Sequence, residues 1–242
     1  MRPDLPDGVR NTVRKLLRGE GHFVGPQVRQ GRGTGSELRW LRSRLLAAGV
    51  SKGVVAAMMT VPREEFVPPY DRSRAYDDWS LPIGHGQTIS QPTLVGKMID
   101  DMEPGPEHVV LDIGTGSGYQ AAILSRLVKR VVSVERVPAL ASAAAERLKR
   151  LGFDNIELHL AGAELGWPED APYDGTVVGA AAPEVPETLV QQLKIGGKLV
   201  MPVGTAEQQD VYIVTRTETG RHIAKKTPVR FVPLIGKGAF AK

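Results

Sequence analysis

One short stretch, residues 109–118, restricts the fold of this chain more than any other. It begins with the apolar run Val109–Ile113, which contains a single acid, and continues as Gly-Thr-Gly-Ser-Gly over residues 114–118. An apolar run of this length is typical of a strand that is buried on both faces of a parallel sheet. Three glycines in five residues let the backbone turn sharply and approach a ligand closely. Because ligands of open α/β sheets bind at the carboxyl ends of the strands, the stretch predicts such a sheet, with a ligand at this loop.

A second acid stands at the end of the next apolar run, Val131–Val134. This acid, Glu135, follows Asp112 by 23 residues. An ionised carboxylate accepts hydrogen bonds, and both hydroxyls of a ribose can donate them. The glycine loop and Glu135 together therefore predict a cofactor that contains adenosine.

Two classes of cofactor are compatible with this loop. Gly116–Ala121 fits the dinucleotide pattern GxGxxA, which is weak evidence on its own. Asp112, two residues before Gly114, favours S-adenosylmethionine, because a carboxylate suits the cationic methionine end and would repel a pyrophosphate. We therefore expect S-adenosylmethionine, with S-adenosylhomocysteine as the product, rather than NAD.

Strand and helix patterns alternate along most of the chain, which predicts a doubly wound parallel sheet. Strands are expected near residues 109–113, 131–135, 155–160, 175–179 and 198–203, and helices near residues 93–102, 119–127, 138–151 and 186–193. Residues 210–215 and 227–234 alternate as antiparallel strands do. The predicted fold class is α/β: a doubly wound Rossmann-like methyltransferase sheet with an N-terminal helical cap and a small C-terminal β-rich substrate segment.

The 242 residues divide into three predicted parts. Residues 1–35 are basic and rich in glycine, and we expect a flexible tail. Residues 36–105 form a helical cap, with Ser36 and Ser51 as the expected helix caps, and a substrate loop over residues 81–92. Residues 106–242 form the S-adenosylmethionine-binding domain together with the C-terminal substrate segment.

Composition excludes several classes of protein. The chain has no cysteine, and its five histidines show no metal-ligand spacing, so we expect no metal. Residues 1–50 hold ten Lys and Arg against four acids, whereas the rest of the chain is slightly acidic. A basic catalytic face for nucleic acid is therefore not expected. No apolar run has the length of a signal peptide or a membrane span, so we expect a cytoplasmic protein, and we expect a monomer.

Several segments resemble the bacterial protein-L-isoaspartate O-methyltransferase family. The similarity lies in residues 81–92, 109–118, 132–135, 166–168, 171–174, 180–186 and 230–234. It extends over about residues 37–236, and the stretch 83–92 is its most specific part. The resemblance implies an enzyme that transfers a methyl group from S-adenosylmethionine to the free carboxylate of isoaspartyl residues in damaged proteins or peptides.

The resemblance also implies a role for individual residues. Ser90 matches the family's active-site serine. The residues expected to contact the substrate are Thr88, Ile89, Val232, Pro233 and Leu234. The residues expected to bind the cofactor are Asp112, Gly114, Thr115, Gly116, Gly118, Glu135, Gly162 and Ala163.

Two positions depart from the family pattern, and both lie on the cofactor side. Gly162 stands where the family has an aspartate near the adenine amino group, and Gly179 stands where it has a threonine. These departures leave two alternatives open. One is a related methyltransferase that esterifies an aspartate in a particular peptide. The other is a catalytically weak homologue that binds the cofactor.

Overall fold

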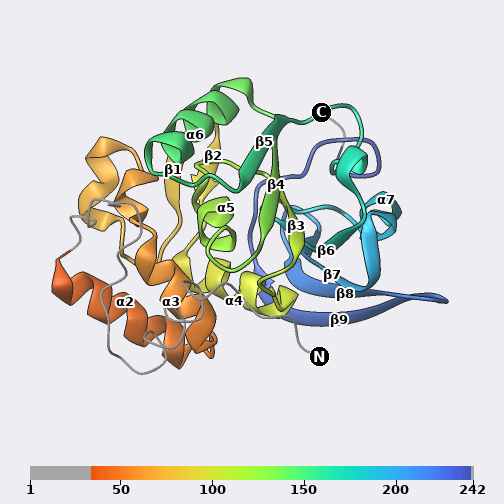
Figure 1. Ribbon diagram of the computed structural model, residues 1–242, viewed down its shortest axis with the longest axis horizontal. Coiled ribbons are helices and arrows are strands. Elements are labelled where there is room, and N and C mark those ends of the chain that lie inside the picture. The colour runs from red at the N-terminus through yellow and green to blue at the C-terminus, as the bar shows by residue number, and fades with distance from the viewer. Residues whose placement is uncertain (1–33, 241–242) are drawn as a thin grey trace. The chain divides into compact units, whose positions relative to one another are not determined.

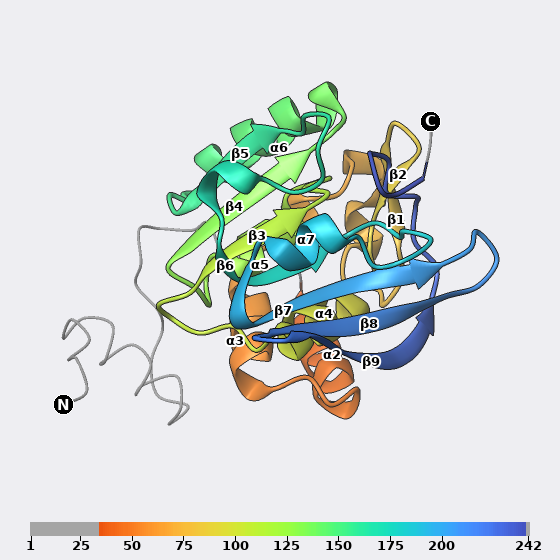
Figure 2. The same cartoon turned by 90° about the vertical axis from the view of Figure 1, so that its right-hand side faces the viewer.

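The computed structural model describes residues 34–240, and its central element is a sheet of seven strands (Figure 1). The strands follow the order β5-β4-β3-β6-β7-β8-β9. Their bounds are β3 Val109–Ile113, β4 Arg130–Glu135, β5 Ile156–Leu160, β6 Tyr173–Val178, β7 Leu193–Gly204, β8 Gln209–Thr217 and β9 Gly220–Val229. The strands from β5 to β7 pair in parallel, and β8 and β9 join antiparallel beside β7 (Figure 2). The predicted sheet is therefore confirmed, including its antiparallel end.

Helices cover both faces of this sheet. Neighbouring residues of a strand point to opposite faces, so Val110 belongs to one hydrophobic core and Leu111 to the other. The helices are α2 Gly35–Ala47, α3 Lys52–Thr60, α4 Pro92–Met102, α5 Tyr119–Leu124, α6 Pro138–Arg150 and α7 Glu187–Gln191. Figure 1 shows α5 and α7 on opposite sides of the sheet. Both faces of the parallel strands are thereby buried, which explains their apolar runs.

The first described helix begins earlier than expected. Its N-cap is Thr34 and not Ser36. The backbone N–H of Thr34 donates to Glu37 Oε2 at 2.7 Å, and the Thr34 hydroxyl accepts from the backbone N–H of Glu37 at 3.4 Å. This reciprocal pair needs an acid three residues after the cap, and the residue three after Ser36 is Arg39. The expected flexible tail lies outside the described residues, except for its last two positions.

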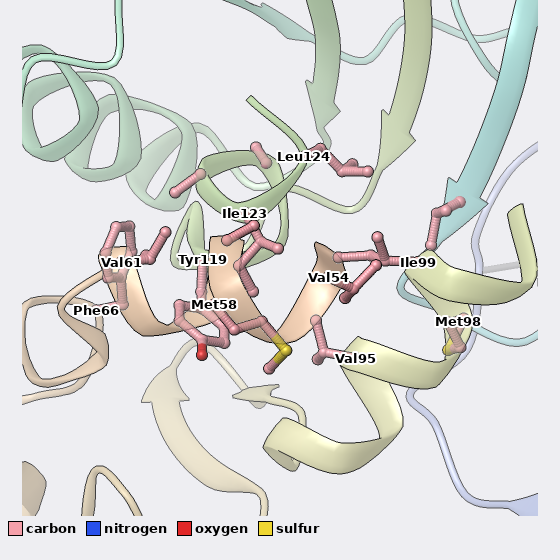
Figure 3. Packing of buried hydrophobic residues seen from close by; sticks show 14 of the residues in the cluster. Val54, Met58, Val61, Phe66, Val95, Met98, Ile99, Tyr119, Ile123 and Leu124 are labelled. Carbon is pink, nitrogen blue, oxygen red and sulfur yellow. The ribbon is translucent and has the colours of Figure 1, made fainter. Parts of the chain in front are cut away.

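Helices α3, α4 and α5 meet in one apolar cluster (Figure 3). Met58 of α3, Val95 of α4 and Ile123 of α5 are each at most 3% exposed. Burying a side chain of this size stabilises the fold by about 1.5–3 kcal/mol. The cluster therefore fixes the N-terminal helices, and α4 in particular, against the sheet.

The expected substrate loop is in fact a β-hairpin over most of its length. Strands β1 Leu81–Gly84 and β2 Gln87–Ile89 pair antiparallel. His85 and Gly86 connect them, with φ angles of 54° and 70°. Positive φ at two consecutive turn residues gives the turn a twist that matches a hairpin. The many turn-forming residues obscured the strands in the sequence, but Leu81 and Ile89 point inward and are buried.

The last expected strand ends earlier than predicted. Strand β9 stops at Val229, and residues 230–234 continue as an extended segment rather than as a strand. Beyond Val229, the N–H of Phe231 donates to the side-chain Oε1 of Gln209 at 2.7 Å, and Pro233 has no N–H to donate. The segment instead binds Ala181, whose N–H donates to Val232 O at 2.8 Å and whose carbonyl accepts from Leu234 N at 2.7 Å. Within residues 34–240, no helix has the length and apolar character that crossing a membrane requires.

Candidate active site

A cavity, here called the cofactor cavity, lies at the carboxyl ends of β3, β4 and β6. Four of the predicted cofactor residues border it, namely Gly114, Gly116, Glu135 and Gly162. Its remaining lining is Gln87, Thr88, Ile113, Val134, Arg136, Val137, Ala161, Glu164, Leu165, Gly166, Gly179, Ala180, Val232, Pro233, Leu234 and Ile235. The site therefore combines two carboxylates, those of Glu135 and Glu164, and the guanidinium of Arg136 with otherwise largely apolar walls, as is common in binding sites for organic cofactors.

The glycine loop has a shape that other residues adopt only with strain. Gly114 and Gly116 have φ angles of 89° and 54°. A Cβ atom at Gly116 would lie 3.3 Å from Cδ1 of Ile83, in strand β1. The hairpin therefore packs directly against the loop, and a side chain at Gly116 would disturb both.

Glu135 is held by the backbone at the rim of the cofactor cavity. Its Oε2 accepts from the N–H of Gly116 at 2.7 Å, and its Oε1 accepts from the N–H of Val137 at 2.8 Å. Only 6% of the residue is exposed. Each carboxylate oxygen has a second lone pair, so Glu135 can still accept from two hydroxyls. The Gly116 amide is therefore directed at Glu135.

The other four predicted cofactor residues do not line the cavity. Asp112 is fully buried and accepts from Gln120 Nε2 at 2.7 Å and from Ser133 Oγ at 2.6 Å. Burial raises the pKa of Asp112 to about 6, although these hydrogen bonds oppose the shift. Asp112 thus links β3 to α5 and β4, and its expected contact with the methionine end of the cofactor stays a prediction.

Thr115, Gly118 and Ala163 also lie outside the lining of the cofactor cavity, each for a different reason. The Thr115 hydroxyl is buried and lies 2.6 Å from Ser133 Oγ. A Cβ atom at Gly118 would lie 3.3 Å from Leu148, so this glycine lets α6 pack closely. Ala163 is exposed and lies outside the cavity lining. The glycine loop thus borders the cavity through Gly114 and Gly116 but not through Thr115 or Gly118.

A second hollow, here called the α4 groove, runs beside the cofactor cavity. Its lining is Ala48, Trp79, Ser80, Thr88, Ser90, Gln91, Thr93, Leu94, Lys97, Met98, Asp101, Gly179, Val211 and residues 226–232. Ser90 and Thr88, the residues predicted at the active site, both line it, and their contact with a substrate stays a prediction. Ile89 does not: it is 4% exposed and lies in the hydrophobic core. Side chains alternate along a strand, so Thr88 and Ile89 cannot both face the groove.

The α4 groove and the cofactor cavity meet at three residues. Thr88, Gly179 and Val232 line both hollows. Pro233 and Leu234, which we expected at the substrate, border the cofactor cavity alone. The junction therefore joins the hairpin, the end of β6 and the C-terminal segment, which are far apart in the sequence.

A buried cation holds Ser90 from below. The Arg63 side chain is fully buried and donates to the carbonyl of Ser90 at 2.8 Å and to that of Ala75 at 2.7 Å. Its guanidinium lies 4.6 Å from the ring centre of Tyr119, a cation–π contact. Burial lowers the pKa of Arg63, and its charge near Tyr119 opposes that shift. The sequence analysis did not predict a buried role for Arg63, because an arginine followed by two acids is typical of an exposed, charged segment.

One cluster of possible metal ligands also escaped the sequence analysis. Ligand atoms of Glu157, His159 and Asp170 lie within 4.8 Å of one another. These residues belong to β5 and to a short turn ten residues later, so their spacing follows no metal motif. Arg130 Nη1 lies 3.1 Å from Glu157 Oε2 and 3.3 Å from Asp170 Oδ2, so a guanidinium already neutralises the two acids.

The parallel sheet, the glycine loop and the carboxylate after the next strand define a Rossmann-like enzyme of the methyltransferase class. Residues 40–239 match the family model described as protein-L-isoaspartate(D-aspartate) O-methyltransferase. The chain belongs to this family.

Relatives and solved structures agree with this assignment. Protein-L-isoaspartate O-methyltransferase 2 of Nitrosococcus oceani is 47% identical over 207 residues, which are 85% of this chain and 93% of the relative. The Methanopyrus kandleri protein-L-isoaspartate O-methyltransferase is 48% identical over 195 residues, or 78% and 86% of the two chains. A solved protein-L-isoaspartate O-methyltransferase superposes with a TM-score of 0.77 and 31% identity, covering 84% of this chain and 67% of that chain. A Plasmodium falciparum structure of the same description, with a TM-score of 0.69 and 26% identity, contains S-adenosyl-L-homocysteine and covers 80% and 96% of the two chains.

Proposed function

We propose that this chain transfers a methyl group from S-adenosylmethionine to the free carboxylate of L-isoaspartyl residues in damaged proteins or peptides. The observation that carries the proposal is the junction at Thr88, Gly179 and Val232, beside Ser90, where the two hollows meet. A cofactor in one hollow and an acceptor in the other would approach each other only there. Membership of the family supports the choice of acceptor.

The cofactor cavity has the chemistry that S-adenosylmethionine needs. Glu135 would accept from the ribose hydroxyls, and Gly114 and Gly116 leave room for a closely bound ligand. Val137 and Leu165 give apolar walls for adenine. The bound group supplies a methyl carbon on a cationic sulfur, which is already electrophilic. S-adenosylhomocysteine in the Plasmodium falciparum structure supports this choice.

The α4 groove would position the acceptor carboxylate rather than supply an acid or a base. A carboxylate is ionised at neutral pH, with an ordinary pKa of about 4, so the reaction needs no general base and no metal. Asp101, the acid of the groove lining, lies about two turns along α4 from Thr93, at the far end of that helix from the hairpin. The hydroxyls of Thr88 and Ser90 would orient the acceptor oxygens. Positioning of this kind can account for a large part of a rate enhancement.

The geometry favours isoaspartate over aspartate. In isoaspartate the main chain leaves through the side-chain carbonyl, so the free carboxylate is one methylene nearer the backbone. A groove that holds the backbone places only one of these two carboxylates at the junction. A displacement of about 1 Å can cost about a hundredfold in rate.

The test uses paired peptides that differ only in isoaspartate or aspartate, with labelled S-adenosylmethionine. We expect methylation of the isoaspartyl peptide and almost none of its partner. Equal rates would refute the repair assignment. Methylation of the aspartyl peptide alone would favour the peptide-specific alternative, and cofactor binding without turnover on either peptide would favour the catalytically weak homologue. A monomeric state and a cytoplasmic location are part of the proposal, to be tested by light scattering and by cell fractionation.

A further inference from the structure

The α4 groove extends well beyond the methyl-transfer junction and changes its chemistry along the way. At the junction it is lined by hydroxyl and small side chains, such as Thr88 and Ser90. Farther along, one face of α4 contributes Thr93, Lys97 and Asp101, which recur every four residues. The groove is therefore long enough to bind residues on one side of the isoaspartate as well as the isoaspartate itself.

The far part of this groove carries an excess of positive charge. Its lining contains the cations Lys97, Lys226 and Arg230 and a single acid, Asp101. Lys226 Nζ lies 3.8 Å from Asp101 Oδ1. Among residues 34–240, Lys97 and Arg230 have no carboxylate partner within 4.0 Å. Two cations of the groove thus form no ion pair with the described residues and can bind an anionic group of a ligand.

The dimensions of α4 give the position of these cations relative to the reacting carboxylate. An α-helix rises 1.5 Å per residue, so Lys97 lies about 6 Å and Asp101 about 12 Å along the axis from Thr93, which follows the hairpin closely. An extended peptide advances about 3.3 Å per residue. Lys97 therefore lies level with a residue about two positions from the isoaspartate, and Lys226, which contacts Asp101, lies level with a residue about four positions away.

We propose that the α4 groove selects isoaspartyl substrates that carry acidic residues two to four positions from the isoaspartate, on one side of it. The proposal rests on the proposed function and adds a preference for an acidic substrate segment. Attraction by Lys97 and Arg230 favours aspartate and glutamate at these positions, and repulsion disfavours lysine and arginine. The exposed ring of Trp79 and the side chain of Leu94 provide apolar contacts that any sequence can use.

The first experiment measures kcat/KM on isoaspartyl peptides of equal length. Glutamate, glutamine or lysine occupies positions two to four, either before or after the isoaspartate. On one of the two sides we expect the glutamate peptides to exceed the lysine peptides by at least fivefold, mainly through KM. The difference should shrink at 0.5 M salt, because partly exposed charges are screened. On the opposite side we expect no comparable effect.

Charge-reversal variants connect the preference with the groove. Lys97→Glu and Arg230→Glu should reverse the order of the glutamate and lysine peptides. Lys129→Glu is the matched control, because it changes the net charge equally. This exposed residue lies at the amino end of β4, whereas the junction lies at the carboxyl ends of the parallel strands. The control should keep the wild-type order. Circular dichroism and cofactor affinity establish that each variant is folded.

The outcomes separate this inference from the proposed function. If all isoaspartyl peptides are methylated equally, whatever their neighbouring charges, the acidic preference is wrong and the repair function stands. A preference that persists in both groove variants also overturns it, since the charges would then act elsewhere. If no isoaspartyl peptide is methylated by a protein that binds the cofactor, the proposed function fails first.

Discussion

The cofactor cavity and the α4 groove differ in how their polar groups are held. In the cavity, both oxygens of Glu135 already accept from backbone amides, and the residue is 6% exposed. In the groove, Trp79 is 67% exposed, and Lys97 has no ionic partner among residues 34–240. A cofactor always has the same shape, so a site fixed in advance binds it without a cost of ordering. A substrate chain varies in sequence, and an open groove with few fixed partners accepts many of them.

The two regions are nevertheless in direct contact. Ile83 of the hairpin packs against Gly116 of the cofactor loop, and Thr88 of the same hairpin lines both hollows. A change in one region can therefore reach the other through β1 and β2. Substitutions in each region should change stability, cofactor affinity or turnover by different amounts, from the largest effect at Arg63 to the smallest at Gly162.

The largest effect should come from Arg63, the buried support of the open region. Arg63→Met keeps the length of the side chain but leaves the carbonyls of Ser90 and Ala75 without their donor. We expect the free energy of unfolding to fall by about 3–5 kcal/mol, as measured by urea denaturation. Arg221→Met is the control, because Arg221 forms a surface ion pair with Glu187 and should contribute less than about 1 kcal/mol. Equal losses in the two variants would show that Arg63 is not the support of the hairpin.

Asp112 should give the next largest effect, and one that depends on pH. Burial raises its pKa in the folded protein to about 6 from an ordinary value of 3.8, whereas the unfolded chain keeps the ordinary value. Between these values the folded state holds more protons, so its stability falls as the pH rises from about 4 to 6. We expect this loss to be about 2–3 kcal/mol and to be absent in Asp112→Asn.

The measurement for Asp112 is the difference in unfolding free energy between the two proteins at each pH, from urea denaturation. The difference should decline from pH 4 to pH 6 and then stay level. Other titrating groups largely cancel, because both proteins contain them. A constant difference over this range would mean that Asp112 ionises normally and that its burial is relieved in solution.

These residues also show how far a sequence can be interpreted. The apolar runs predicted the parallel strands because burial on both faces leaves a continuous signal. Spacing and resemblance identified the segments that border the two hollows. Spacing and resemblance did not reveal that the side chains of Asp112 and Ile89 point away from the hollows. The direction of a side chain depends on strand register and packing, which only the assembled sheet fixes. Arg63 was missed for the same reason, since its partners are backbone carbonyls 12 and 27 residues away.

A pair of variants separates the two regions functionally. Glu135→Ala removes the ribose acceptor and frees the amides of Gly116 and Val137, so S-adenosylmethionine should bind about 1–3 kcal/mol more weakly by calorimetry. Ser90→Ala lies on the groove side and should lower kcat for an isoaspartyl peptide about tenfold, while cofactor affinity stays near the wild-type value. The reverse pattern, or parallel losses in both variants, would show that the cavity and the groove do not act as distinct sites.

The smallest effect concerns Gly162, where the family has an aspartate. A Cβ atom at Gly162 meets no other atom within 4 Å, and the residue lies on the border of the cofactor cavity, so a side chain fits there. Gly162→Asp should tighten S-adenosylmethionine binding about tenfold in calorimetry, or about 1.4 kcal/mol, because a carboxylate can accept from the adenine amino group. Gly162→Asn retains an acceptor without the charge and should gain less, while Gly162→Ala should leave affinity unchanged. If the aspartate variant binds no better than the alanine variant, the cavity of this chain binds adenine through other residues, and the rigid region differs from its relatives in more than one side chain.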